Sequence, residues 1–202
     1  MRAFHIAFAG APAQLAEIET PRPEPGQIRL RIAACGLNFA DLLMEKGTYQ
    51  DTPEAPFTLG MEVAGTVDAL GEGVTGLEPG QRVAVFGGQG GLAEFGCFEA
   101  ARAVAIPETM SFTDAAAFQI AYGTSHLALS HRARLQPGEH LLVLGASGGV
   151  GLTAVEIGRI MGATVIACAR GAEKLEAARA AGAHHLLDSE TCDLRADVKR
   201  NA

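Results

Sequence analysis

A cluster of glycines in the second half of the chain has the composition of a loop that binds phosphate groups. It reads Gly145-Ala146-Ser147-Gly148-Gly149-Val150-Gly151 and follows the apolar run His140 to Leu144. A strand that leads through such a loop into a helix leaves free N–H groups and partial positive charge at the helix N-terminus, and both favour a pyrophosphate. The glycines let the phosphates approach the backbone and let the helix pack closely on the sheet. We therefore expect Ser147 to Gly151 to bind a dinucleotide, against the alternative of a purely structural glycine-rich turn.

The end of the next apolar run bears on which dinucleotide is bound. There the sequence reads Cys168-Ala169-Arg170-Gly171, and Lys174 follows one turn into the next expected helix. An acidic residue at this place would hold the ribose 2′-hydroxyl of NAD, whereas a nearby arginine suits the 2′-phosphate of NADP. No acidic residue stands between Cys168 and Glu173. We expect Arg170 and Lys174 to favour NADPH, against the alternative that both are ordinary solvated charges.

The residues around these two stretches predict a parallel α/β arrangement. Ser111, with Asp114 three residues later, is a plausible cap for a helical pattern that continues to about Leu129. Beyond it we expect strands at 140–144, 164–168 and 184–187, and helices from about 150 to 161 and from 172 to 181. Alternating strands and helices are typical of a parallel sheet with right-handed crossovers.

The first half of the chain has a different pattern, in which short apolar runs are separated by turn residues. The turns include Pro25-Gly26, Gly71-Glu72-Gly73 and Pro79-Gly80. Such spacing predicts a mostly antiparallel β domain. One short helix is expected over residues 40–46, and Asp41 either faces solvent or caps it.

Composition and charge exclude several classes of protein. With 48% apolar and 19% charged residues in a chain of 202, intrinsic disorder is excluded. The formal net charge of -7 and the lack of any basic run disfavour nucleic-acid binding. The charge-free stretch from Leu141 to Val155 is too short and too rich in glycine to span a bilayer, and no signal sequence is evident, so we expect a cytoplasmic protein without membrane partners. The four cysteines form no Cys-x-x-Cys pair, which argues against a disulfide scaffold and a zinc lobe.

Four stretches, in this order, make the sequence resemble the medium-chain dehydrogenase/reductase superfamily, in its zinc-independent quinone oxidoreductase branch. They are Ala34 to Asp41 (ACGLNFAD), Leu59 to Gly65 (LGMEVAG), Gly76 to Val83 (GLEPGQRV) and the glycine loop. The resemblance implies a GroES-like, mostly antiparallel β domain at 1–121 that carries the substrate site. It also implies a partial Rossmann domain at 122–202, with the active site in the cleft between the two domains.

The same resemblance argues against zinc. In the zinc-dependent alcohol dehydrogenases of the superfamily, metal-binding Cys, His and Cys stand where this chain has Asn38, Met61 and Ala116. An amide, a thioether and a methyl group do not replace thiolates and imidazole as zinc ligands. The loop from Phe86 to Gly91 is also too short, and lacks the cysteines, for a structural zinc lobe. We therefore expect no zinc.

Without a metal, carbonyl reduction depends on hydride donation and on hydrogen bonds to the developing negative charge. The resemblance places Asn38 and Tyr49 at the nicotinamide and the substrate, as catalytic residues, and Thr124 near the nicotinamide. Asn38 would orient the cofactor or donate to the substrate oxygen, and Tyr49 would donate its hydroxyl or stack on a planar quinone. The alternatives are a turn or cap residue for Asn38, loop packing for Tyr49 and an ordinary helix residue for Thr124.

The expected activity is hydride transfer from NADPH to a quinone, or to another α,β-unsaturated carbonyl such as an enone or an enoyl thioester. The family's Rossmann domain has six parallel strands, and about three are expected here, so we expect a fragment of a longer protein that would form a homo-oligomer when complete. Two other classes remain open, a non-catalytic NADPH-binding or interaction protein and an inactive remnant.

Overall fold

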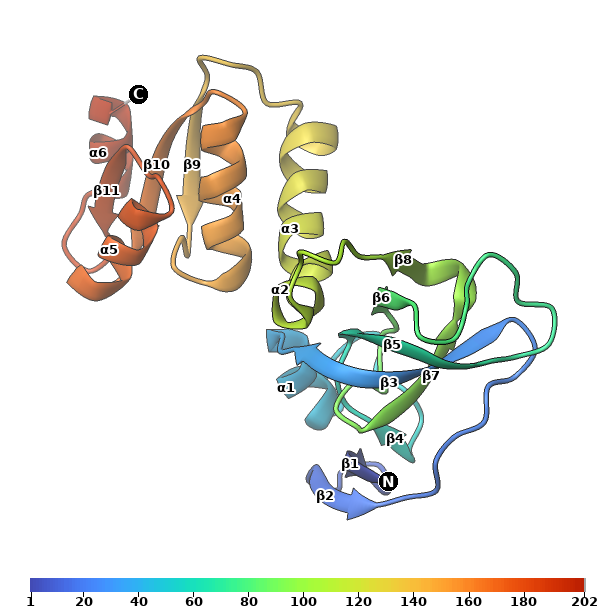
Figure 1. Cartoon of the computed structure of the whole chain (residues 1–202). Helices are drawn as coiled ribbons and strands as arrows, with labels where there is room; N and C mark the ends of the chain where they lie inside the picture. Colours follow the sequence, from blue (N-terminus) through green and yellow to red (C-terminus); the bar gives the residue numbers. More distant parts are fainter. Residues whose placement is uncertain (202) are drawn as a thin grey trace. The chain divides into compact units, whose positions relative to one another are not determined.

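The structure is a computed structural model that describes residues 1–201. It consists of two units, Met1–Gln119 and Ile120–Ala202, which are described separately. The first unit contains two antiparallel sheets and the second a parallel one, and Figure 1 labels their elements.

The larger sheet of the first unit has five strands in the order β7-β3-β5-β6-β8, all antiparallel to their neighbours. These strands are β3 (Gln27–Gly36), β5 (Glu62–Leu70), β6 (Arg82–Phe86), β7 (Phe95–Glu99) and β8 (Ala103–Ala105). The smaller sheet has the order β2-β1-β4, with β1 (Arg2–Ile6), β2 (Gln14–Glu17) and β4 (Phe57–Thr58). The short helices α1 (Phe39–Glu45) and η1 (Ala100–Arg102) complete this part of the unit. The antiparallel β domain expected from the turn spacing is therefore confirmed (Figure 1).

The core of this unit forms because inward-facing apolar residues alternate along the strands. In β3, Ile28 and Leu30 are fully buried while their neighbours Arg29 and Arg31 lie nearer the surface. Their partners in the core come from β5, β6 and β7: Val63, Val67, Val83, Val85 and Phe98. Burying each such side chain stabilises the fold by about 1.5–3 kcal/mol relative to leaving it exposed.

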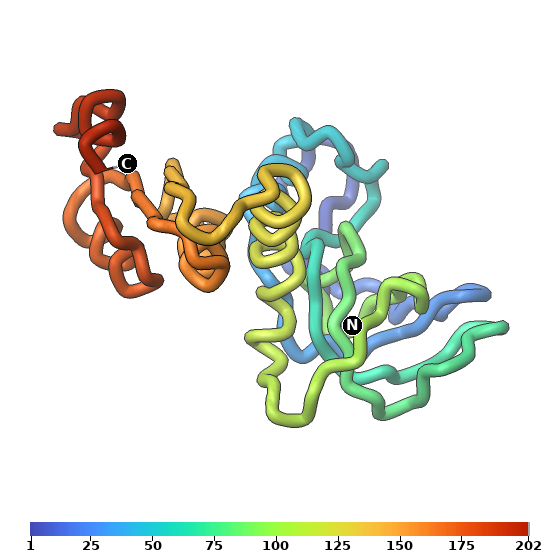
Figure 2. The backbone as a smooth tube through the Cα atoms, turned by 90° about the horizontal axis from the view of Figure 1, so that it is seen from above, coloured from blue at the N-terminus to red at the C-terminus, as the bar shows by residue number. Residues whose placement is uncertain are grey.

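The helical pattern after Ser111 is not one helix, and this part of the prediction is wrong. The Ser111 hydroxyl caps α2 (Phe112–Ala116) by accepting the Asp114 N–H at 3.0 Å, as expected. The chain then breaks, and α3 (Gln119–His126) runs directly into a π-helix, η2 (Leu127–Ala133) (Figures 1 and 2). The break occurs because the alanines of α2 pack on the larger sheet of the first unit, whereas α3 is tied to the second unit.

The second unit has a parallel sheet in the order β11-β10-β9, formed by β9 (His140–Leu144), β10 (Thr164–Ala169) and β11 (His185–Asp188). The helices α4 (Gly149–Ile160) and α5 (Ala172–Ala180) connect the strands, and α6 (Leu194–Asn201) follows β11. Val155 of α4 and Ala178 of α5 pack with Val165 and Ala167 of β10 in one buried cluster. The predicted α/β fold class is confirmed, and the three strands lie within two residues of their expected positions.

Within residues 1–201, no helix is both long enough and apolar enough to cross a lipid bilayer.

Candidate functional site

The glycine loop leaves the carboxyl end of β9 and enters the N-terminus of α4. Gly145 adopts a φ of +64°, a conformation that side chains other than glycine rarely take. Its carbonyl oxygen accepts the Gly148 N–H at 3.0 Å, which closes the turn. The N–H of the buried Ala146 donates to the carbonyl oxygen of Cys168 at 3.1 Å, so the loop is fixed to the end of β10.

The space around the loop fits a phosphate group bound against the backbone. A Cβ atom added to Gly145 or Gly149 would meet no protein atom within 4 Å, and one on Gly148 would meet only the Gly145 carbonyl oxygen, at 3.5 Å. Gly148, Gly149 and Val150 are exposed, and the helix that begins here has N–H groups without intrahelical acceptors. The loop therefore has an open, positively polarised surface of the kind that binds pyrophosphate.

A buried hydroxyl network holds α3 against the first turn of α4. The Ser125 hydroxyl donates to the Val150 carbonyl oxygen and lies 2.8 Å from the Thr153 Oγ1. Thr153 Oγ1 in turn lies 3.0 Å from the Ala121 carbonyl oxygen, which belongs to α3. Thr124, next to Ser125, is exposed on α3. Thr124 was expected from the sequence, whereas Ser125 and Thr153 were not, because nothing in their spacing shows that the two helices meet.

The two basic residues expected to select NADPH lie at the carboxyl end of β10 and in the first turn of α5. Arg170 and Lys174 are exposed. Arg170 forms an ion pair with Glu190, with 3.7 Å between Nε and Oε1. Asp188 at the end of β11 accepts the Gly171 N–H at 3.2 Å and so positions the loop that carries Arg170. Both acidic residues belong to the end of the third strand and the turn after it, and they were not expected from the sequence because only the parallel pairing brings them here.

In the first unit, Asn38 is held by two buried carboxylates. Its backbone N–H donates to Asp41 Oδ2 at 2.8 Å, and its side-chain Nδ2 donates to Glu62 Oε1 at 2.9 Å. Asp41 Oδ1 accepts the Gly60 N–H at 3.1 Å. Asp41 and Glu62 are only 6% and 2% exposed, so Asp41 caps the helix and does not face solvent. The contact of Glu62 with Asn38 was not expected from the sequence.

Asn38 lines an apolar cavity of about 490 Å³ in the first unit. The other lining residues, most of them apolar, are Phe4, Leu37, Phe39, Asp41, Leu42, Glu45, Leu59 and Leu92. Leu37 and Phe39 are 76% and 74% exposed, an unusual exposure for side chains of this size. Tyr49 lies beyond α1 in a turn, where its carbonyl oxygen accepts the Thr52 hydroxyl at 2.6 Å. It is half-buried and is not among the residues that line this cavity.

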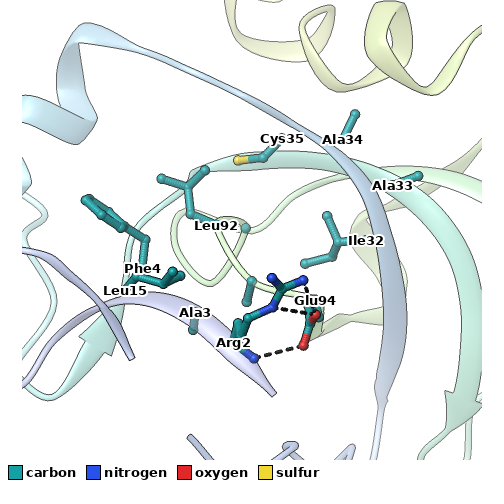
Figure 3. Close-up of a pocket in the computed structure, with 12 residues that line it drawn as sticks. Arg2, Ala3, Phe4, Leu15, Ile32, Ala33, Ala34, Cys35, Leu92 and Glu94 are labelled. Carbon is teal, nitrogen blue, oxygen red and sulfur yellow. Dashed lines mark hydrogen bonds and ion pairs between the residues drawn. The ribbon is translucent and has the colours of Figure 1, made fainter. Parts of the chain in front are cut away.

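A second, larger cavity of about 550 Å³ lies in the same unit (Figure 3). The Arg2 guanidinium points toward Glu94 and donates to its Oε1 at 2.8 Å, and the Arg2 backbone N–H donates to Oε2. These hydrogen bonds, the backbone one first, lower the pKa of the Glu94 carboxyl. Cys35 also lines the cavity, and burial together with Asp41 and Glu62 raises the pKa of its thiol to about 12. None of the predicted site residues lines this cavity.

Two family profiles match the chain. The alcohol dehydrogenase GroES-like domain matches residues 24–108, and the zinc-binding dehydrogenase family matches residues 149–202. The fold and these matches define a class of protein related to the alcohol dehydrogenases, with a GroES-like domain followed by a parallel α/β domain.

Individual relatives narrow this class. The chain is 41% identical over 180 residues to the human synaptic vesicle membrane protein VAT-1 homolog, covering 89% of this chain and 46% of the relative. It is 35% identical to the rat quinone oxidoreductase, over 100% of this chain and 63% of the relative. The quinone oxidoreductase of Thermus thermophilus, whose structure was also solved with NADPH, superposes with a TM-score of 0.86 at 38% identity, over 99% of this chain and 64% of that one.

The chain belongs to the medium-chain dehydrogenase/reductase superfamily, in its quinone oxidoreductase branch. It spans about half to two thirds of the length of these relatives.

Proposed function

We propose that this chain acts in the transfer of hydride from NADPH to a quinone or another α,β-unsaturated carbonyl compound. The open glycine loop between β9 and α4 is the observation that carries the proposal, because its shape and polarity suit the pyrophosphate of a dinucleotide. The relatives named quinone oxidoreductase support the type of reaction. In this proposal residues 1–121 form the substrate domain and residues 122–202 form part of the nucleotide-binding domain.

Residues of the second unit would hold the cofactor. Ser147 to Gly151 would bind the pyrophosphate through backbone N–H groups, and Arg170 and Lys174 would bind the 2′-phosphate. Thr124 would lie near the nicotinamide. Arg170 suits this role because a guanidinium offers a charge and several donors to a phosphate. When bound, NADPH supplies a hydride to the acceptor.

The acceptor would bind at Asn38, over the apolar cavity of the first unit. The exposed side chains of Leu37 and Phe39 suit a planar, apolar molecule such as a quinone. Hydride addition leaves negative charge on the acceptor oxygen, which a hydrogen-bond donor stabilises. Asn38 and Tyr49 each carry such a donor, and we assign both to the catalytic site.

We propose that the reaction needs no zinc, because the residues at the expected ligand positions do not fit this metal. Met61 is buried and Ala116 has no ligand atom in its side chain. The Asn38 amide is already engaged by Glu62. Zinc in proteins is bound by thiolate, imidazole and carboxylate groups. Among residues 1–201, no three His, Cys, Asp or Glu side chains are grouped so that they could hold a metal.

The proposal includes the oligomeric state, the cellular location and the partners of the protein. We expect a homo-oligomer in the cytoplasm that acts on a small molecule and has no nucleic-acid or membrane partner. The formal net charge of -7 supports the absence of a nucleic-acid partner, because the phosphate backbone of a nucleic acid repels an acidic protein.

A substrate panel tests the activity. NADPH oxidation by the 202-residue chain is followed with quinones, enones and enoyl thioesters as acceptors. Turnover with one of these classes, faster with NADPH than with NADH, supports the proposal. NADPH binding without turnover on any acceptor would indicate a non-catalytic NADPH-binding protein, and absence of both binding and turnover would overturn the proposal.

A further inference from the structure

The hydrogen bond between Asn38 and Glu62 joins a half-buried amide to a carboxylate that is almost completely buried. Asn38 Nδ2 donates to Glu62 Oε1 across 2.9 Å, and Glu62 is 2% exposed. Hydrogen bonds to a charged acceptor are stronger than those between neutral groups, and a low-dielectric setting strengthens them further. The contact is therefore strong enough to decide how the Asn38 side chain is oriented.

The place of Glu62 is itself tightly defined. Glu62 is the first residue of β5 and pairs directly with Gly36, the last residue of β3. A Cβ atom at Gly36 would lie 2.6 Å from Glu62 Oε1 and 2.5 Å from the Ala116 carbonyl oxygen. Only a glycine at position 36 leaves room for the carboxylate, so the sheet fixes the acceptor that the Asn38 amide meets.

A carboxylate enforces one of the two possible orientations of an amide. An ionised carboxylate only accepts hydrogen bonds, whereas an amide has an N–H₂ donor and a carbonyl acceptor. Turning the Asn38 amide over would place its Oδ1 against Glu62 Oε1, two acceptors facing each other. With Nδ2 donating to Glu62, Asn38 turns Oδ1 toward the Asp41 backbone N–H in the capping box of α1, and the second hydrogen of Nδ2 is the one that would donate in the role proposed above.

We propose that Glu62 is a positioning residue, which acts on the reaction only through the orientation of the Asn38 amide. This inference rests on the role proposed above for Asn38. Asp41 has a separate task, because its carboxylate holds the Asn38 backbone N–H and the Gly60 N–H and leaves the side-chain amide to Glu62.

The orientation of the amide is measured directly by NMR on the 202-residue chain labelled with 15N. The side-chain N–H₂ signals of Asn38 are assigned by their loss in Asn38→Ala. In Glu62→Gln, which keeps the shape but replaces the carboxylate with an amide, we expect the Asn38 proton bonded to position 62 to shift upfield. Glu72→Gln, at an exposed turn, is the matched control and should leave these signals in place.

Kinetics test whether the orientation matters for the reaction. We expect Glu62→Gln to lower kcat about tenfold, the effect of one charged hydrogen bond, with little change in KM for NADPH. The double variant Glu62→Gln with Asn38→Ala should be no slower than Asn38→Ala alone, because both changes act through one amide.

Four results separate the possibilities. An unmoved Asn38 signal in a folded Glu62→Gln chain overturns the inference, and so does a double variant that is much slower than Asn38→Ala. If Glu62→Gln fails to fold, Glu62→Asp decides instead, since it keeps the charge and draws the carboxylate away from Asn38 Nδ2; an unmoved Asn38 signal in that variant would overturn the inference. If the wild-type chain turns over no acceptor, the proposed function fails, and the NMR shift still decides whether Glu62 orients the amide.

Discussion

The carbonyl oxygen of Gly145 lies 2.2 Å from the position that a Cβ atom would take at Gly151. The first turn of α4 is therefore packed against the loop that precedes it with no room for a side chain. This approach brings the helix N-terminus to the carboxyl end of β9, where we propose that the phosphates of the cofactor bind.

Gly151→Ala should therefore destabilise the second unit. The added methyl group clashes with backbone atoms, which cannot move aside as a side chain can, so we expect a loss of about 1–3 kcal/mol in the free energy of unfolding. Urea denaturation measures it. Gly123→Ala is the matched control, because a Cβ there meets nothing within 4 Å and alanine favours a helix. Equal stability of the two variants would contradict the packing described here.

Arg170→Ala should reduce the preference for NADPH over NADH. Loss of a charged hydrogen bond to the 2′-phosphate predicts NADPH binding that is weaker by about tenfold or more, with NADH binding unchanged. Fluorescence titration with each nucleotide measures both affinities. Arg179→Ala, on the exposed surface of α5, serves as the control. An unchanged ratio of the NADPH and NADH affinities in Arg170→Ala would show that Arg170 does not bind the 2′-phosphate.

Cys35 should make the stability of the protein fall at alkaline pH. Burial, with Asp41 and Glu62 nearby, raises the pKa of its thiol from 9.0 to about 12. Between these values the unfolded chain loses the thiol proton and the folded chain keeps it. The contribution of Cys35 to the free energy of unfolding is therefore constant below pH 9 and falls as the pH rises toward 12. Urea denaturation across this range should show a shallower fall for Cys35→Ala than for the wild-type chain. If the free energy of unfolding fell equally with pH in both chains, the Cys35 thiol would not be the cause of the fall.

The sequence predicted those elements whose cause is local. The run His140 to Leu144 is a strand because a short apolar segment is bounded by turns, and the Ser111 cap forms from residues three positions apart. Both elements are determined by residues that are close together in the sequence, so they can be predicted from one sequence alone.

Contacts made by tertiary packing could not be predicted in this way. The break after α2 arises because Ala115 and Ala116 pack on a sheet, and an alanine-rich sequence gives no sign of it. Glu62 reaches Asn38 only through the pairing of β3 with β5, and Asp188 reaches Gly171 only through the pairing of β10 with β11. Sequence motifs thus identified candidate site residues, whereas the residues that contact these candidates in the structure were not expected from the sequence.

The most direct test of the central claim, that the glycine loop binds NADPH, is calorimetric titration of NADPH into the 202-residue chain and its Gly149→Ala variant. A Cβ at Gly149 meets no protein atom within 4 Å, so the variant should fold with a stability equal to or up to about 1 kcal/mol above that of the wild-type chain. The methyl group would occupy the surface that the phosphates approach. We predict that the wild-type chain binds NADPH and that the variant, still folded, binds it at least about tenfold more weakly, the cost of losing one charged hydrogen bond. Equal affinities, or no binding by the wild-type chain, would contradict the account.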